Sequence, residues 1–439
     1  MPKANDSVDK VRQLQRALYR AAKLSATRRF HAFYDKVYRM DILWRAWGMV
    51  KANCGVAGVD GQTIKAIEEG GVGIFLNQLR EELEVGRFRP QPVRRVYIPK
   101  PDGRQRPLGI PVIRDRVVQA AMKIVIEPIF EADFQSCSFG FRPKRSAHDA
   151  NEVIRQTVNK GYNWVVDADI QSYFDTIDQG KLMALVAKRI SDRRILKLIR
   201  SFLKAGVLEE GEVQVAKTGT PQGGVLSPIL ANIYLNYLDK IWMKRCGQLG
   251  VLVRYADDLV ILCRREADAQ EALRRLGIVI ERLRLKLHPT KTRMVNLKKG
   301  REGFDFLGFH HRKVHSWRYG EEYLQRWPGH KAMNTIREKV RAITGARQYL
   351  KRSLKEIISQ LNPILRGWGN YFAVGNSTRQ FQAVDNYVRE RLYLFLSKKY
   401  DRSGRGWAAR WPNIHFQQEG LYHLNGTVRR HVYAVKAAG

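Results

Sequence analysis

The feature that most restricts the fold is an apolar run interrupted by two adjacent acids. Residues 251–263 read Val-Leu-Val-Arg-Tyr-Ala-Asp-Asp-Leu-Val-Ile-Leu-Cys, with Asp257 and Asp258 in the middle. Unpaired carboxylates inside a buried segment are costly unless something binds them. A β-hairpin solves this problem, because its arms become paired apolar strands and the acids lie at the turn. An ordinary solvated Asp-Asp turn remains the alternative.

A second apolar segment, 164–170, also carries two acids. Strand side chains alternate between faces, so Asp167 and Asp169 would share one face and the apolar residues the other. Two acidic strand ends can face each other across a sheet. Converging carboxylates hold Mg²⁺, and two such ions about 3.5–4 Å apart promote phosphoryl transfer. The two segments together therefore predict a two-metal site.

The charge of the chain indicates its partner. The 78 Lys and Arg residues against 42 Asp and Glu residues give a net charge of +36. Such an excess repels itself in a compact fold unless a polyanion neutralises it, which favours a nucleic-acid partner. A hydrophobic content of 44% excludes wholesale disorder. No apolar run approaches roughly 18 residues, so no membrane span is expected.

The four cysteines form no CxxC pair, which argues against a zinc finger or disulfide scaffold and fits a reducing compartment. Residues 92–112 alternate around the turn Pro101-Asp102-Gly103 and predict a basic hairpin, either a phosphate-binding fingertip or merely an exposed hairpin. Residues 219–228 are rich in glycine and turn residues, so their backbone can approach a ligand closely, or they simply enter a helix.

Helical patterns cover several further segments. We expect helices within residues 1–52, with Asp41 capping 42–50, and over 115–127, where Pro128 would end the helix. Further helices are expected over 191–203 and 229–238. Residues 331–400 have helical periodicity, with breaks expected at Asn362-Pro363 and at Gly367-Trp368-Gly369.

The order of these pieces resembles a reverse transcriptase, and most closely the reverse transcriptase/maturase encoded by bacterial group II introns. The resemblance covers about residues 35–400. Its motifs are Asn53 to Gly61, Phe139-Gly-Phe-Arg-Pro-Lys-Arg-Ser-Ala-His148, Asp169-Ile-Gln-Ser-Tyr-Phe174-Asp175, Gly219-Thr-Pro-Gln-Gly-Gly-Val-Leu-Ser-Pro228, Tyr255-Ala-Asp-Asp258, Leu287-His-Pro-Thr-Lys291-Thr, Phe306-Leu-Gly-Phe309 and Gly367-Trp-Gly-Asn-Tyr-Phe372.

The resemblance implies an α+β right-hand polymerase with fingers, an antiparallel palm sheet and a helical thumb. The N-terminal extension and the start of the fingers would span 1–85, and the fingers 86–160. The palm would span 161–310, with fingers helices at about 180–210, and the thumb or maturase domain 311–400. The basic segment 401–439 would be either a small DNA-binding piece or a segment packed on the thumb.

The resemblance also implies residue roles. Asp169, Asp257 and Asp258, assisted by the Ile170 carbonyl, would bind two Mg²⁺ ions, with Mn²⁺ as a possible substitute. Asp167 is an unresolved rival. Phe174 would lie under the deoxyribose, Gln222 would line the incoming nucleotide and Lys291 would lie near the leaving pyrophosphate. The triphosphate would be held by Arg94, Lys100 and Arg106, and the primer by Phe306, Leu307, Gly308 and Phe309.

The expected function is RNA-directed DNA synthesis combined with binding of the intron RNA to assist splicing and mobility. The expected partners are the group II intron RNA, an RNA template with a DNA primer, dNTPs and target DNA, in the bacterial cytoplasm. Residues 401–439 contain no cysteine, which resembles the short class C type without an HNH endonuclease. The alternatives are a domesticated reverse transcriptase in repair or defence and a non-catalytic RNA-binding splicing cofactor.

Overall fold

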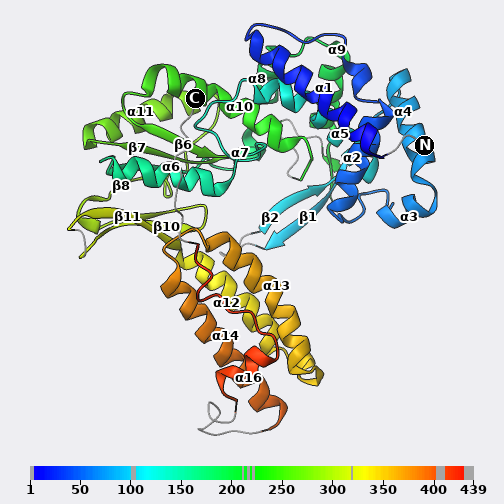
Figure 1. Cartoon of the computed structure of the whole chain (residues 1–439). Coiled ribbons are helices and arrows are strands. Elements are labelled where there is room, and N and C mark those ends of the chain that lie inside the picture. The colour runs from blue at the N-terminus through cyan, green and yellow to red at the C-terminus, as the bar shows by residue number, and fades with distance from the viewer. Residues whose placement is uncertain are drawn as a thin grey trace. The chain divides into compact units, whose positions relative to one another are not determined.

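The computed structural model describes residues 4–99, 105–209, 212–214, 218–219, 223–317, 320–401 and 411–429. The chain divides into two compact units (Figure 1). The first unit comprises residues 1–146, 166–261 and 266–293, and the second comprises 147–165, 262–265 and 294–439. No helix of the described residues is long and apolar enough to cross a membrane.

Helices make up most of the first unit. They are α1 (Ala4–Leu24), η1 (Tyr34–Lys36), α2 (Met40–Ala52), α3 (Ile64–Glu69), α4 (Val72–Val85), α5 (Ile113–Glu131), α7 (Tyr173–Thr176), α8 (Gln179–Ala187), α9 (Arg193–Lys204), α10 (Ser227–Ile241), η2 (Trp242–Cys246) and α11 (Glu266–Arg282). Helices α1 and α2 pack on α5, which is buried along most of its length.

Two expectations about these helices are wrong. Asp41 does not cap α2: Arg39 is the residue before the first turn, and the Asp41 carboxylate lies inside that turn, where it pairs with Arg39. Helix α5 continues through Pro128 to Glu131. A proline inside a helix removes one backbone hydrogen bond. Burial of Ile124, Val125 and the residues that follow outweighs this loss.

Two sheets involve strands of the first unit. In the sheet β2-β1-β4-β5, β1 (Val93–Pro99) and β2 (Gln105–Ile110) form the predicted antiparallel hairpin, whose turn lies outside the described residues. Strand β4 (Val207–Glu209) runs parallel to β1, and β5 (Glu212–Gln214) pairs with β4. The second sheet has the order β6-β7-β3-β8, formed by β6 (Val251–Tyr255), β7 (Asp258–Cys263), β3 (Trp164–Ala168) and β8 (Arg293–Asn296).

The second unit combines a small sheet with a helical bundle. Its elements are α6 (Ala147–Asn159), η3 (Lys298–Gly300), β9 (Gly303–Phe306), β10 (Phe309–His315), β11 (Glu322–Pro328), α12 (His330–Gly345), η4 (Arg347–Lys351), α13 (Leu354–Phe372), α14 (Thr378–Lys399) and α16 (Asn413–Gln418). The sheet order is β11-β10-β9. Helix α12 packs against both α13 and α14 (Figure 1).

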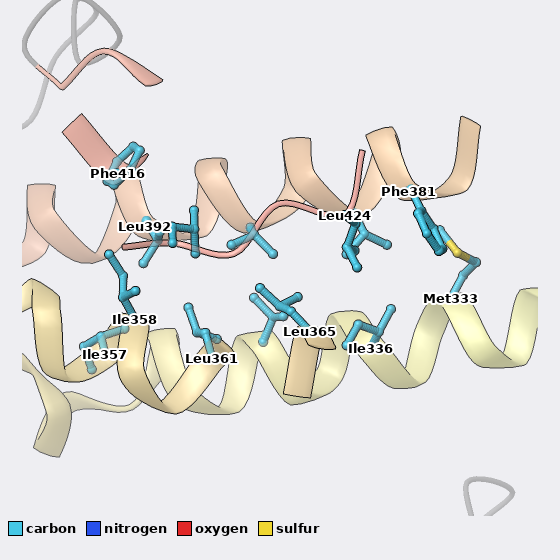
Figure 2. Packing of buried hydrophobic residues seen from close by; sticks show 14 of the residues in the cluster. Met333, Ile336, Ile357, Ile358, Leu361, Leu365, Phe381, Leu392, Phe416 and Leu424 are labelled. Atoms are coloured by element: carbon cyan, nitrogen blue, oxygen red, sulfur yellow. The ribbon is translucent and has the colours of Figure 1, made fainter. Parts of the chain in front are cut away.

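The breaks expected at Asn362-Pro363 and at Gly367-Trp368-Gly369 are also wrong, because α13 runs through both. The α-helices are interrupted instead at 346–353, where Ser353 and Glu356 form a capping box that starts α13, and at 373–377, before α14. Buried Leu361 and Leu365 lie along α13 and face the core of the bundle (Figure 2). This packing keeps the helix continuous despite its proline and glycines.

The described part of the basic C-terminal segment, residues 411–429, packs on the bundle. Phe416, Leu421 and Leu424 belong to the same buried cluster as the residues of α13 and α14 (Figure 2). The carboxylate of Asp385 accepts hydrogen bonds from the backbone N–H groups of Leu424 and Asn425. Phe416, Leu421 and Leu424 are thus part of the helical core, although the segment is basic.

Candidate active site

The predicted acids lie where strands of one sheet end. The alternation along β3 is as expected, because Val166, Ala168 and Ile170 are buried, whereas Asp167 and Asp169 keep a partly exposed side chain. The hairpin is also confirmed: β6 ends at Tyr255, β7 begins at Asp258, and the turn between them contains Ala256 and Asp257. Ala256 has a left-handed backbone with φ of 57°.

The pKa of Asp258 is raised by its burial and by the neighbouring acids. Desolvation by the surrounding protein atoms, followed by the charges of Asp257, Asp169 and Asp167, raises the pKa of Asp258 to about 7, and Lys291 opposes this shift. Asp258 nevertheless keeps an exposed surface, so water can reach its carboxylate. The four carboxylates therefore form one site of concentrated negative charge, which a bound cation would relieve.

Two basic residues that follow α11 form ion pairs with Asp167 in β3 and with Asp169 just after it. The Lys291 ammonium lies 2.6 Å from Oδ2 of Asp169, and the Arg293 guanidinium lies 3.3 Å from Oδ2 of Asp167. The N–H of His288 also donates to the carbonyl of Asp169, at 2.8 Å. Each of the two rival acids therefore has a basic partner of its own.

The Ala256-Asp257 turn rests on a buried arginine that sequence reasoning missed. The Arg254 guanidinium is fully buried and forms two hydrogen bonds with the Asp239 carboxylate, of 2.8 and 2.6 Å. It also donates to the carbonyl of Ala256 at 2.7 Å, to Asn232 and to Ser138. Breaking a buried ion pair costs about 3–5 kcal/mol, so this network holds the turn firmly. The sequence does contain a signal for this network, because Arg254 is a charged residue inside an apolar strand.

Gly140 brings a second segment against the same turn. A Cβ atom at this position would lie 2.4 Å from the backbone nitrogen of Ala256 and 3.0 Å from the carbonyl carbon of Tyr255. The carbonyl of Gly140 accepts a hydrogen bond from Asn232, at 2.8 Å. The motif 139–148 thus begins by packing directly beneath the acidic turn, and only glycine fits there.

The glycine-rich loop, 219–228, begins in close contact with the backbone at Phe174. Gly219 has φ of 85°, and a Cβ atom there would lie 2.9 Å from the carbonyl oxygens of Phe174 and Asp175. Gly223, with φ of 106°, approaches the carbonyl of Gly109 on β2 in the same way. The two glycines therefore place the ends of the loop against the Phe174 turn and the basic hairpin. Gln222, between them, lies outside the described residues.

The expected triphosphate contacts are described only in part. Lys100 and the side chain of Arg106 lie outside the described residues. Arg94 donates to the carbonyl of Ala57 at 2.9 Å, in the glycine-rich segment 53–61. Arg116, another residue that sequence reasoning missed, donates to the carbonyls of Val56 and Pro111. These arginines hold the segment 53–61 against the hairpin.

In the second unit, the expected primer grip is a tight β-hairpin. Leu307 and Gly308 join β9 to β10, and both have a positive φ, of 50° and 81°. Positive φ at both central residues suits the twist of a two-residue hairpin. Phe306 and Phe309 are buried, and Phe309 packs against Phe372. Of the four expected primer-grip residues, Leu307 and Gly308 keep exposed surface.

The donor set suits a hard divalent cation, because carboxylate and backbone oxygens are the preferred ligands of Mg²⁺. Within the part of the chain that the structure describes, no three His, Cys, Asp or Glu side chains converge closely enough to hold a metal ion. The Asp169–Lys291 ion pair occupies one of the expected donor oxygens. The residue types fit a cation, and binding would require the carboxylates to come closer together than they lie in the described residues.

Two family models match the chain. The model described as reverse transcriptase (RNA-dependent DNA polymerase) matches residues 98–311, and the group II intron maturase-specific domain matches residues 333–411. The first match includes Asp169, Asp257, Asp258 and Lys291. The second includes most of the helical bundle of the second unit.

Several known sequences are similar. Protein YkfC of Escherichia coli (strain K12) is 38% identical over 315 residues, which cover 63% of this chain and 81% of YkfC. Group II intron-encoded protein LtrA of Lactococcus lactis subsp. cremoris is 40% identical over 214 residues, which cover 48% of this chain and 35% of LtrA. Nuclear intron maturase 1, mitochondrial, of Arabidopsis thaliana is 39% identical over 94 residues, which cover 21% of this chain and 13% of that protein.

Proposed function

Because the chain belongs to the reverse transcriptase/maturase family of group II introns, we propose that its carboxylate site performs RNA-templated DNA synthesis. The family and its α+β polymerase fold agree with the sequence-based prediction. The observation that carries the assignment of the site is the pairing of β7, which begins at Asp258, with β3, which contains Asp167 and leads to Asp169. The raised pKa of Asp258 supports it. Two segments distant in sequence, 167–169 and 257–258, thereby contribute to one centre.

We assign cation binding to Asp169, Asp257 and Asp258, with the Ile170 carbonyl assisting. Two Mg²⁺ ions, or Mn²⁺ in their place, would stabilise negative charge on the attacking and leaving oxygens. Lys291 already lies at this centre, paired with Asp169. Its ammonium would neutralise charge on the leaving pyrophosphate after that pair opens. Arg254 holds the turn that presents Asp257.

Other residues would bind the substrates. Phe174 would contact the deoxyribose, and Gln222 the incoming nucleotide. Arg94, Lys100 and Arg106 would hold its triphosphate, although Arg94 now contacts Ala57. The hairpin turn at Leu307 and Gly308 would contact the primer, with Phe306 and Phe309 supporting it from the core.

The proposed partners are group II intron RNA, an RNA template with a DNA primer, dNTPs and target DNA. A net charge of +36 supports a polyanionic partner. Four free cysteines, three of them buried, support a reducing compartment such as the bacterial cytoplasm. A repair or defence role remains the second candidate, because the same polymerase site would serve it.

Primer extension on an RNA template tests the site. Asp257→Asn removes a negative charge from the proposed cation site and should reduce extension roughly a hundredfold or more. Binding of the RNA should remain within about twofold of the wild type. Extension at a near-normal rate would contradict the assignment of Asp257.

Asp167→Asn is the matched control, because Asp167 lies on the same face of the strand as Asp169 but pairs with Arg293. This variant should be far milder. A loss of extension as large as that of Asp257→Asn would mean that Asp167 belongs to the cation site.

A further inference from the structure

The second unit contains a polar cavity whose lining residues are separate from the carboxylate site. Its volume is about 580 Å³, within the range of small-molecule binding sites. Its lining comes from α6, β11, the start of α14 and the C-terminal segment, and consists of Arg155, Arg326, Val374, Gly375, Asn376, Thr378, Asn425, Gly426, Val428 and Arg429.

Three guanidinium groups make this cavity cationic. Arg326 is buried in its wall, Arg155 is partly exposed, and Arg429 is exposed at its edge. The carboxylate of Glu152 lies 2.6 Å from Arg155 and 3.2 Å from Arg326, so it pairs with both arginines. Asp385 lies nearby but accepts hydrogen bonds from the backbone of the C-terminal segment. The described lining of the cavity contains three arginines and no acidic residue, so its charge is positive.

The start of α14 adds hydrogen-bond donors. Thr378 is the first residue of this long helix and lines the cavity. The preceding Ser377 does not cap the helix, because its hydroxyl donates instead to the carbonyl of Phe372. The first N–H groups of a helix lack intrahelical acceptors and favour anions. The helix start therefore reinforces the positive potential that the arginines create.

The C-terminal wall is held in place by backbone contacts. The N–H of Arg429 donates to the carbonyl of Ala373 at 2.9 Å. In the same loop, the N–H of Asn376 donates to the carbonyl of Arg326 at 2.6 Å. A Cβ atom on Gly375 would lie 2.6 Å from that same carbonyl, so this loop packs tightly. The cavity is thus built from ordered backbone as well as long side chains.

We propose that this cavity binds phosphate groups of an RNA strand. Planar guanidinium groups match phosphate oxygens, and Asn376, Thr378 and Asn425 can donate to sugar or phosphate oxygens. This inference rests on the proposed nucleic-acid function, but concerns a surface separate from the carboxylate site. It also gives the basic C-terminal segment a role, since residues 425–429 form one wall.

The test measures binding of a 20-nucleotide single-stranded RNA to the full chain across a salt series. Arg429→Glu should weaken binding about tenfold and lower the log–log salt slope by about 0.7 for each phosphate that the variant no longer neutralises. Thr378→Trp should weaken binding similarly by filling the cavity without changing the charge. Arg347→Glu, on the exposed surface of η4 in the same unit, is the matched charge control and should change binding less than about twofold.

Amide hydrogen exchange locates the bound RNA without any variant. RNA should protect residues 374–379 and 424–429 in the wild-type protein. Absence of protection there, or equal effects of Arg429→Glu and Arg347→Glu, would overturn the proposal. AMP and inorganic phosphate serve as competitors: protection of the cavity by AMP but not by RNA would identify a free-nucleotide site and would also overturn it.

Primer extension by the same wild-type preparation separates the two proposals. RNA-dependent protection of the cavity without any extension would refute the polymerase function and leave this site standing. Primer extension without RNA-dependent protection of the cavity would refute the cavity site and leave the polymerase function standing.

Discussion

At the residue scale, Tyr173 and Phe174 are adjacent aromatic residues with different environments. Tyr173 is 2% exposed, and its hydroxyl donates to the carbonyl of Ala231 at 2.6 Å, so it belongs to the core. Phe174 is only partly buried, and its ring lies 5.3 Å from that of Tyr173. Of the two, Phe174 is the one available to contact a sugar.

Phe174→Ala should admit ribonucleotides much better than the wild type does. A 2′-OH is a small group, so a site rejects it only by occupying its space or by leaving polar groups unpaired. The measurement is the ratio of kcat/KM for dNTP over rNTP, which should fall by roughly tenfold or more. Tyr173→Phe is the control and should leave the ratio unchanged. Equal losses on both sugars would show that Phe174 is structural.

Asp115 provides a pH-dependent prediction away from the metal ligands. This side chain is 1% exposed, and one of its oxygens accepts a hydrogen bond from the N–H of Gln91 at 2.8 Å. Burial is the main cause that raises its pKa to about 7. Because the folded pKa exceeds the unfolded value of about 4, folding favours the protonated acid. The residue therefore destabilises the fold progressively as pH rises from about 4 to 7.

Asp115→Asn should remove this dependence. Relative to the variant, the wild type should lose up to about 4 kcal/mol of unfolding free energy between pH 4 and pH 7. Urea unfolding at several pH values measures the difference. Glu81→Gln, which removes a charge from an exposed position on α4, is the control. A difference between wild type and Asp115→Asn that does not vary with pH would show that Asp115 ionises normally in the fold.

At the scale of elements, the two glycines of the Gly367-Trp368-Gly369 segment have different roles. A Cβ atom on Gly369 would lie 2.5 Å from a methyl carbon of Leu424, whereas one on Gly367 would meet nothing within 4 Å. Gly369 therefore permits the C-terminal segment to pack on α13. Gly367 lies inside the same helix without such a constraint.

Alanine substitutions should separate these roles. Gly367→Ala should stabilise the second unit by up to about 1 kcal/mol, because alanine is the better helix former. Gly369→Ala should destabilise it by about 1–3 kcal/mol, because the added methyl overpacks the contact with Leu424. Thermal unfolding of both variants measures the two effects. Stabilisation by both substitutions would mean that residues 421–424 do not pack on α13.

At the scale of the whole molecule, charge should dominate association with RNA. With a net charge of +36, binding should release counterions from many phosphates. At about 0.7 per phosphate, six contacts on single-stranded RNA give a log–log slope near −4, or roughly a hundredfold or greater loss between 50 and 200 mM salt. Fluorescence anisotropy measures the slope, and Asp257→Asn should retain it. A slope near zero would show that few phosphates are contacted.

The sequence by itself determined the local structure and the family. Strand alternation placed Asp167 and Asp169 on one face, and the interrupted apolar run predicted the hairpin around Asp257. These patterns are reliable because backbone geometry sets the period of two in a strand. The order of motifs then indicated the family, because Asp169, Asp257 and Lys291 each stand within a motif that resembles one of the family's motifs.

Tertiary structure alone decided which distant segments meet. Arg254 contacts Asp239 and Ser138, and Leu424 packs against Gly369; no local pattern indicates these partners. The same is true of the helices through Pro128 and Pro363, where packing outweighs a local preference. The free energy of such contacts depends on burial and on partners far away in the chain. A local pattern contains neither quantity, so it could predict the acids but not the network that holds them.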